Sequence, residues 1–578
     1  MTGPAAPKDP EKARPFFYIL KDKDIFGERQ KDGTGIQFIY ESDGRLINSA
    51  QVTGNVTDKE ELRLLETVEG FGRLVHSIGV SVETDRPEET AEFIFQMYGK
   101  KDLYGGGTNL TTSLKCDGME HRIYLSDYRW TEDDHVPGQI KILFAAPERM
   151  GKVSVRLFLN DGYEAPPEEE DLVIDMHSEE YCGMISRSLL QLGNPYRIRK
   201  AIEKSKAGKE VTLAYIGGSI TQGAGAIPIH TECYAYKSFQ LFQNRFSTQN
   251  NVRFIKAGVG GTPSELGMIR FDRDVLREGE RPDIVVIEFA VNDEGDETKG
   301  VCYESLVRKV LKLPWKPAVV LLFSVFANDW NLQERLRPVG NLYDLPMVSI
   351  RDAVTQQFSL KCGEGRILSK NQFFYDIFHP NNTGHTIMAD CLQYLFERCD
   401  AAEPARVGTF VEGMTEEQIL SEKLSGPAVI GADFERIFLL DKKNRYVGAK
   451  IRAGSFTSTD MELQSVEMDG NLIQTPEFPY NWMYDGSRPQ MAGFEMEIIC
   501  KSLFLIFKDS GETDVGKANV FVNDVYCMTA DPHKNNWLHC NAVLLFWETE
   551  SRSHKVRIAV TEEDRNKKFT ILGFGYTI

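Results

Sequence analysis

The sequence has no run of apolar residues that approaches the roughly 20 needed to cross a membrane. Its first residues, MTGPAAPKDPEKARPFF, also lack the basic region and following apolar stretch that mark a secretory signal. We therefore expect a cytoplasmic protein with no membrane partner.

Positive charge is in short supply. The chain has 67 lysine and arginine residues against 85 aspartate and glutamate residues, which gives a formal net charge of −18. Proteins that bind nucleic acids gather lysine and arginine on one face to neutralise phosphates. We therefore expect no nucleic-acid partner, and neutral or cationic ligands fit this charge better than anionic ones.

Paired cysteine motifs are also missing. The ten cysteines are scattered, and none forms a Cys-x-x-Cys pair. Neither a zinc site nor a disulfide framework is indicated, so we expect mainly buried free thiols and no metal.

The 578 residues exceed the about 250 to 300 residues at which a single hydrophobic core stops growing, so we expect about three domains. Short apolar runs rich in aromatic and β-branched residues, separated by Gly, Asp and Pro turns, predict an N-terminal β-sandwich of the jelly-roll kind with a polar arm, residues 1–185. A second set of short strands predicts a connector and another β-sandwich in residues 405–578. Between them, residues 186–404 alternate strands with helices.

This alternation predicts a parallel sheet, because parallel strands need crossover helices. We predict strands at 211–216, 252–256, 283–289 and 318–325, with helices near 232–246 and 301–312. The first of these helices has one apolar face, made of Ala235, Phe239, Phe242 and Phe246, and a closing helix has another, made of Met388, Cys391, Leu392 and Leu395.

A glycine-rich turn, AYIGGSITQGAG, follows the strand at 211–216. A phosphate-binding loop is excluded because Ala224 stands where its lysine must be, and a dinucleotide fingerprint fails because Pro228 stands at its third glycine. Ser219 then has two interpretations. It is either a nucleophile at the edge of a parallel sheet, where such sheets bind ligands, or a residue that caps a helix.

A serine nucleophile needs a base that a carboxylate orients. The segment FFYDIFHPNNTGH supplies Asp376 and His379 three residues apart, so that one turn can hold both. An α/β-hydrolase elbow is not present, because Thr221 takes the place of its last glycine. An Asp-x-x-His sequence is by itself also typical of a surface turn.

Acyl transfer further needs donors for an oxyanion. Gly261 follows the strand at 252–256 and Asn292 follows the strand at 283–289, so both share one sheet edge with Ser219. A glycine lets a backbone N–H approach a ligand without a side chain in the way. Each residue alone also fits a simpler role, a tight turn for Gly261 and a backbone cap for Asn292.

Together, GGSIT around Ser219, GVGGT around Gly261, VND around Asn292 and DIFHP with Asp376 and His379 resemble, in order, the four blocks of the SGNH (GDSL-type) hydrolases. The resemblance covers little over a third of the chain. It implies a flavodoxin-like three-layer α/β domain with a parallel sheet, flanked here by the two predicted β-sandwiches. The Gly-Asp-Ser-Leu box reads Gly-Gly-Ser-Ile, which makes a lipase-like subgroup less expected.

The resemblance also implies roles. Ser219 would be the nucleophile, His379 the base and Asp376 its orienting acid, with an oxyanion hole made of the N–H groups of Ser219 and Gly261 and the amide of Asn292. It implies no metal and no organic cofactor.

The domain order looks like that of bacterial carbohydrate acetylesterases. We therefore expect a serine esterase that removes O-acetyl groups from plant-polysaccharide-derived oligosaccharides, with the acetylated oligosaccharide as its partner and an oligomer possible. Two alternatives stay open, namely an esterase or thioesterase for a lipid or other small acyl compound, and a non-catalytic carbohydrate-binding protein.

Tryptophans are candidates for sugar contacts because sugar rings stack on aromatic faces. Trp482 and Trp537 are surrounded by Asn, Asp, Pro and His, which predicts loops, whereas Trp547 in VLLFWETE predicts a strand core. We assign substrate contact to Trp330, Trp482 and Trp537. The alternative is that they pack a domain or an interface between domains.

Overall fold

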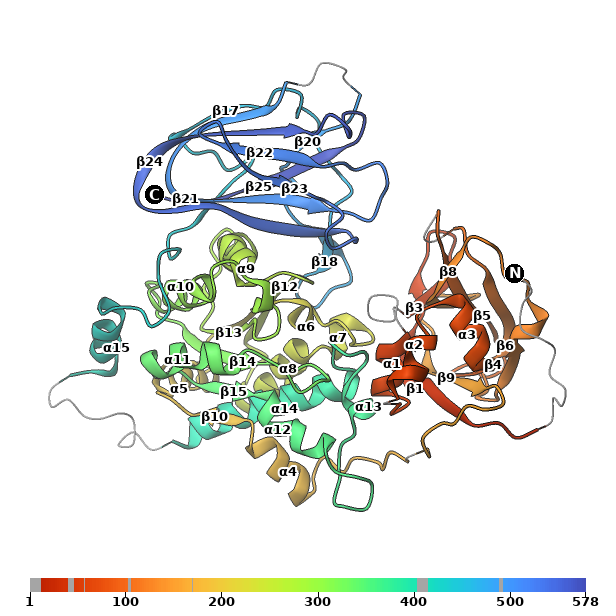
Figure 1. The fold of residues 1–578 in the computed structure, drawn as a ribbon. Helices are drawn as coiled ribbons and strands as arrows, with labels where there is room; N and C mark the ends of the chain where they lie inside the picture. Colours follow the sequence, from red (N-terminus) through yellow and green to blue (C-terminus); the bar gives the residue numbers. More distant parts are fainter. Residues whose placement is uncertain are drawn as a thin grey trace.

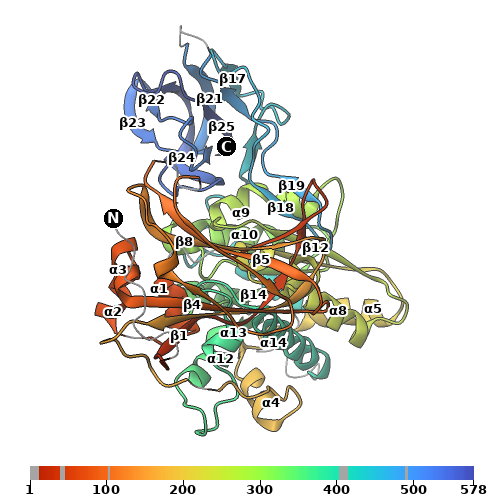
Figure 2. The same ribbon diagram turned by 90° about the vertical axis from the view of Figure 1, so that its right-hand side faces the viewer.

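The computed structural model describes residues 12–39, 46–56, 58–101, 105–168, 170–402, 414–487 and 492–578. An N-terminal body of strands, a central body of alternating helices and strands and a C-terminal body of strands follow one another along the chain (Figure 1). Figure 2 shows the N-terminal body in front of the central body, with the C-terminal body above both.

The N-terminal body has two antiparallel sheets around one core. One sheet has the order β1 (Phe16–Phe26), β9 (Met150–Leu159), β4 (Val75–Thr84) and β7 (His121–Tyr124). The other has the order β2 (Glu28–Arg29), β3 (Gly35–Ile39), β8 (Asp134–Phe144), β5 (Thr90–Gly99) and β6 (Asn109–Lys115). Alternate residues of both sheets point inward, among them Val80, Phe93 and Val155, and are fully buried. Three helices not expected from the sequence accompany them, α1 (Leu46–Val52), α2 (Lys59–Leu64) and α3 (Val68–Leu74).

The central body contains the expected parallel sheet. Its strand order is β10 (Leu189–Gln191), β15 (Met347–Ser349), β14 (Ala318–Phe323), β13 (Ile284–Glu288), β11 (Val211–Gly217) and β12 (Val252–Gly258). All neighbours pair in parallel except β10, which is antiparallel to β15. The four predicted strands are confirmed, and the short β10 and β15 are additions.

Helices cover both faces of this sheet. One face carries α4 (Glu179–Ser186), α5 (Tyr196–Lys206), α8 (Tyr234–Phe246), α12 (Ile350–Phe358) and α14 (Asn382–Ala401), and the other carries α9 (Ser264–Phe271), α10 (Val301–Leu311) and α11 (Gln333–Tyr343). The predicted apolar face of the closing helix is confirmed, because Met388, Cys391, Leu392 and Leu395 of α14 are all fully buried. The body therefore has the three layers that the resemblance implies.

The C-terminal body is an antiparallel sheet with a two-stranded ribbon below it. The sheet contains β16 (Phe438–Leu440), β17 (Ala449–Arg452), β20 (Trp482–Tyr484), β21 (Phe494–Asp509), β22 (Ala518–Val522), β23 (Val525–Ala530), β24 (His539–Val560) and β25 (Phe569–Thr577). The ribbon pairs β18 (Ser465–Glu467) with β19 (Gln474–Pro476), and helix α15 (Glu416–Ser425) precedes both.

In the described ranges, no helix combines the length and the apolar character that a membrane crossing requires. All ten cysteines are unpaired, and all are buried except Cys182, Cys362 and Cys527. The expectation of mainly buried free thiols is therefore confirmed.

Candidate active site

The turn after β11 places a serine at the carboxyl edge of the parallel sheet. A Cβ atom on Gly217 would lie 2.2 Å from Thr221 Oγ1, and one on Gly218 would lie 2.1 Å from Asn292 Oδ1. Only glycine fits such close approaches. The two glycines therefore let Ser219 begin the short helix α6 (Ser219–Gln222) directly beside Asn292.

A histidine and an aspartate complete a line of hydrogen bonds to this serine. His379 Nε2 lies 2.9 Å from Ser219 Oγ, and His379 Nδ1 lies 2.8 Å from Asp376 Oδ2. The other carboxylate oxygen of Asp376 accepts hydrogen bonds from the N–H groups of Phe378 at 2.7 Å and His379 at 2.8 Å. A single turn thus holds both side chains, as their spacing in the sequence predicts.

The same contacts shift the ionisation of both groups. Burial alone would lower the pKa of His379, but the charge and hydrogen bond of Asp376 raise it above its ordinary value. Burial alone would raise the pKa of Asp376, but His379 and the two N–H donors hold it below its ordinary value. Asp376 is therefore ionised at neutral pH and stabilises the protonated form of His379.

Asn292 lies where an oxyanion donor is expected. It follows the end of β13, and its amide lies against Gly218, the residue before Ser219. Its Oδ1 is buried and accepts no hydrogen bond from a described residue. Its Nδ2 also forms no hydrogen bond with a described residue, so its N–H groups are available to a ligand.

Two glycines lie in the loop after β12, and one of them borders the serine. Gly261 has a φ of +70° and is exposed, and a Cβ on it would lie 2.6 Å from Trp537 Cζ2. The sequence did not single out Gly260, yet a Cβ there would lie only 3.8 Å from Ser219 Cβ. The Gly260 N–H donates to Gln222 Oε1 at 3.0 Å, so a ligand would have to displace that side chain to use it.

Trp537 brings the C-terminal body to this site. It lies on a loop before β24, as predicted, is 44% exposed and stacks on His539 with ring centroids 4.5 Å apart. Gln464 fixes the loop, because its Nε2 donates to Gly260 O at 2.8 Å while its Oε1 accepts from Cys540 N at 2.9 Å. The indole therefore forms a rim beside the Gly261 turn.

Trp330 lies near the opposite side of the triad. Its ring stacks on Phe326 at 5.9 Å, and Phe326 meets Phe378 edge-on at 4.9 Å. Phe378 directly precedes His379. Backbone contact holds these loops together, since Ala327 N donates to Ile377 O at 2.9 Å. Trp330 is thus connected to the Asp376–His379 turn through two phenylalanine rings.

The prediction for Trp482 is wrong. This residue lies on strand β20 and not on a loop, is only 6% exposed and packs against Phe494 and Phe574 in the C-terminal core. A ring inside a core offers no face to a sugar. The polar neighbours of Trp482 suggested a loop, but one of them, Asn481, is itself buried and hydrogen-bonded to the backbone. Trp547 is on a strand as predicted, but it is 43% exposed and packs on Phe434 instead of entering the core of its own body.

A buried carboxyl group below the serine was missed. Glu288 ends β13 and is fully buried, and its Oε2 accepts a hydrogen bond from Thr221 Oγ1 at 3.2 Å. Burial raises the pKa of Glu288 to about 7, and its negative charge in turn raises the pKa of His379. The signal in the sequence was an acidic residue closing an otherwise apolar strand.

Within the described ranges, no three or more His, Cys, Asp or Glu side chains gather as a metal ion would require. The polar groups beside one another at the site are the Ser219 hydroxyl, the His379 imidazole and the Asp376 carboxylate.

Known proteins are similar to the chain in this region. Residues 215–387 match the GDSL-like Lipase/Acylhydrolase family. Among solved structures, a two-domain esterase (CEX) active on acetylated mannans shares 22% identity, with a TM-score of 0.54 over 68% of this chain and 99% of that one. A structure of a two-domain esterase (CEX) active on acetylated mannans, co-crystallised with mannopentaose, gives a TM-score of 0.55 at 22% identity over 68% of this chain and 98% of that one. No curated protein matches the chain.

Proposed function

We propose that this chain, with its GDSL-like acylhydrolase region at residues 215–387, is a serine esterase that removes O-acetyl groups from plant-polysaccharide-derived oligosaccharides. The observation that carries the proposal is the line of hydrogen bonds from Asp376 through His379 to Ser219 at the carboxyl edge of the sheet. A neutral serine is a weak nucleophile, and this arrangement is the one that activates it.

The proposed reaction has two halves. Ser219 Oγ attacks the acetyl carbonyl carbon while His379 Nε2 takes its proton, and the proton then passes to the sugar oxygen as the ester bond breaks. Water attacks the resulting acetyl-serine in the same way, and acetate leaves. In both halves the negative oxygen would be stabilised by the N–H groups of Ser219 and Gly261 and by the amide of Asn292.

We infer the substrate class from the tryptophans on the two sides of the site. Trp537 on one side and Trp330 on the other offer aromatic surface of the kind on which sugar rings stack. The similar structure is an esterase active on acetylated mannans, which agrees with this class. Under the cytoplasmic location expected from the sequence, the substrates would be imported oligosaccharides.

We also propose three domains with the predicted bounds, namely β-sandwich domains at 1–185 and 405–578 and the hydrolase domain at 186–404. The separate two-sheet core of the first body and the separate core around Phe494 and Phe574 in the last support a division into three domains.

Acetate release from a panel of acetylated oligosaccharides tests the proposal, with Ser219→Ala as the control. We expect release by the natural protein and none above background by the variant. Faster turnover of long-chain lipid esters or thioesters would favour the lipid alternative. Oligosaccharide binding without Ser219-dependent release would favour the non-catalytic one.

A further inference from the structure

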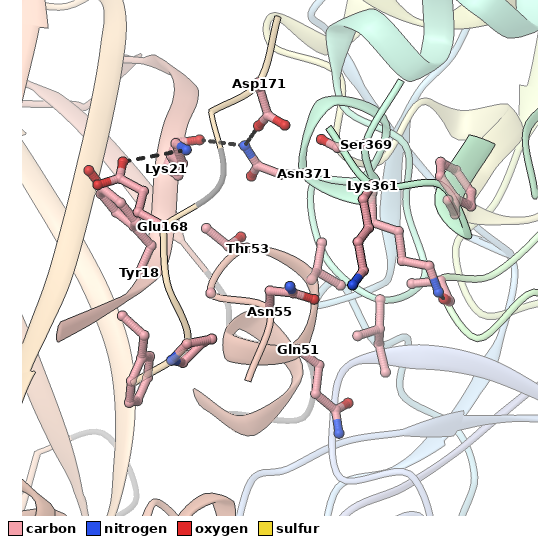
Figure 3. A pocket seen from close by; sticks show the side chains of 18 of the residues that line it. Tyr18, Lys21, Gln51, Thr53, Asn55, Glu168, Asp171, Lys361, Ser369 and Asn371 are labelled. Carbon is pink, nitrogen blue, oxygen red and sulfur yellow. Dashed lines mark hydrogen bonds and ion pairs between the residues drawn. The ribbon is translucent and has the colours of Figure 1, made fainter. Parts of the chain in front are cut away.

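A cavity lies between the N-terminal body and the central body. It has a volume of about 690 Å³ and is lined by β1 and α1, by the chain after β9 and by loops of the central body (Figure 3). Its lining includes residues 326–328, which follow the carboxyl end of β14. The cavity therefore opens at the same sheet edge as Ser219, with only β13 between β14 and β11.

The walls of this cavity are fixed by polar contacts between the two bodies. Lys23 of β1 is only 2% exposed, and its ammonium donates to Asn371 O at 3.2 Å and also to Phe374 O. Asn371 Nδ2 donates to Asp171 Oδ2 at 3.0 Å. A buried lysine is costly unless its hydrogen bonds are made, so these contacts hold one arrangement of the bodies. The cavity is thus preformed.

The cavity also reaches the turn that carries two residues of the proposed triad. Ile377 and Phe378 line it, and they are the two residues between Asp376 and His379. Trp537 borders the turn after β12 on the other side of Ser219. An oligosaccharide that reached from Trp537 into the cavity would therefore pass Ser219.

The charge of the cavity is opposite to that of the whole chain. Its lining contains five cationic side chains against the two carboxylates of Glu168 and Asp171, whereas the chain has a net charge of −18. The five cations are Lys21, Lys59, Lys361, Arg366 and Lys370. The neutral or cationic ligands expected from the overall charge therefore do not suit this site.

Two of these five cationic side chains have no ion-pair or hydrogen-bond partner among the described residues. Lys21, Arg366 and Lys370 lie 3.4 to 3.7 Å from the carboxylates of Glu168, Asp171 and Asp329. The ammonium groups of Lys59 and Lys361, in contrast, form no ion pair or hydrogen bond with any described residue. Figure 3 shows the Lys361 side chain extending into the cavity, toward the wall that carries Asn55.

We propose that this cavity is a subsite for the part of the oligosaccharide beyond the acetylated unit and that it takes a sugar bearing a carboxylate. This inference deepens the proposed esterase function and rests on it. A carboxylate makes strong charge-assisted hydrogen bonds with ammonium groups, and half-buried Phe326 and Phe378 offer apolar surface for a sugar ring. The volume lies within the roughly 300 to 1,000 Å³ of small-ligand sites. The preferred substrates are therefore acidic acetylated oligosaccharides.

Binding to the full-length Ser219→Ala protein tests the subsite without turnover. Calorimetry would compare unbranched xylotetraose with xylotetraose that carries a glucuronic acid branch. We expect the branched sugar to bind about tenfold more tightly, because an uncommitted ammonium group gains a charged partner. Adding Lys361→Ala should remove most of this advantage. Lys209→Ala is the matched control, because Lys209 is an exposed lysine at the opposite, amino end of β11 and should leave the advantage intact.

Equal binding of the two sugars, or an advantage that survives Lys361→Ala, would overturn the proposal. The carboxylate could also come from a separate small ligand instead of from the substrate, and free glucuronate tests this alternative. If glucuronate alone changes the rate at which the natural protein hydrolyses a small aryl acetate, the cavity is an effector site and the subsite proposal fails. Failure of the esterase function itself would show differently, as absent Ser219-dependent acetate release from every oligosaccharide.

Discussion

The two flanking bodies meet the central body in different ways. The C-terminal body shares an apolar core with it, in which Phe504, Ile506 and Leu572 pack together with Ile269 of α9. The N-terminal body meets it through hydrogen bonds at Lys23 and Asn371 and through Val52 of α1, which packs into the central core, and a cavity lies beside this contact. We infer that the C-terminal body shapes the rim of the site and the N-terminal body selects what extends from it.

These roles of the flanking bodies assume that the central body alone supplies the catalytic residues. His379→Ala should therefore lower kcat on a small aryl acetate by at least about 10⁴-fold, and the double variant with Ser219→Ala should be scarcely worse, because triad members act as one unit. Steady-state kinetics on folded variants would check this. Additive losses in the double variant would show that the two residues do not act together.

The oxyanion donor should give the next largest effect. Asn292→Ala should lower kcat by roughly a hundred- to a thousandfold with little change in KM, because the amide would donate only to the charged oxygen of the transition state. The same aryl acetate assay measures it. A change confined to KM would instead make Asn292 a residue that binds the substrate.

Variants of two tryptophans distinguish the substrate-binding role of the C-terminal body from the packing of its core. Trp537→Ala should lower kcat/KM on an acetylated oligosaccharide by roughly tenfold through lost stacking, with little effect on an aryl acetate. Trp482→Ala should instead lower the free energy of unfolding by about 3 to 5 kcal/mol, because it empties a core position. Denaturant titration distinguishes them. Equal losses of stability in both variants would mean that Trp537 also serves packing.

The smallest expected effect concerns pH. His379 must be neutral to accept a proton, so kcat/KM should rise with pH through a pKa raised above the ordinary histidine value of about 6.5. Glu288→Gln removes a nearby negative charge that favours protonated His379. The rise should therefore move to lower pH in this variant, as pH–rate profiles would measure. A shift to higher pH would contradict this electrostatic account.

The sequence predicted those parts of the molecule in which near neighbours carry the signal. Buried strands such as β11 and β13 are continuous apolar runs, and Asp376 and His379 lie within one turn, so both could be found from spacing. The role of Glu288 and the burial of Trp482 depend on what packs over them. The cavity joins β1 to a loop more than 300 residues later, and no local pattern marks such a meeting.

The central claim is that the acetyl group of the substrate is transferred to Ser219 before water releases it as acetate. Rapid acid quenching during turnover of an acetylated oligosaccharide, followed by peptide mass spectrometry, tests it most directly. We predict that the peptide containing Ser219 gains one acetyl group in the natural protein and that Ser219→Ala neither gains the group nor releases acetate. Undiminished acetate release by well-folded Ser219→Ala would contradict the account.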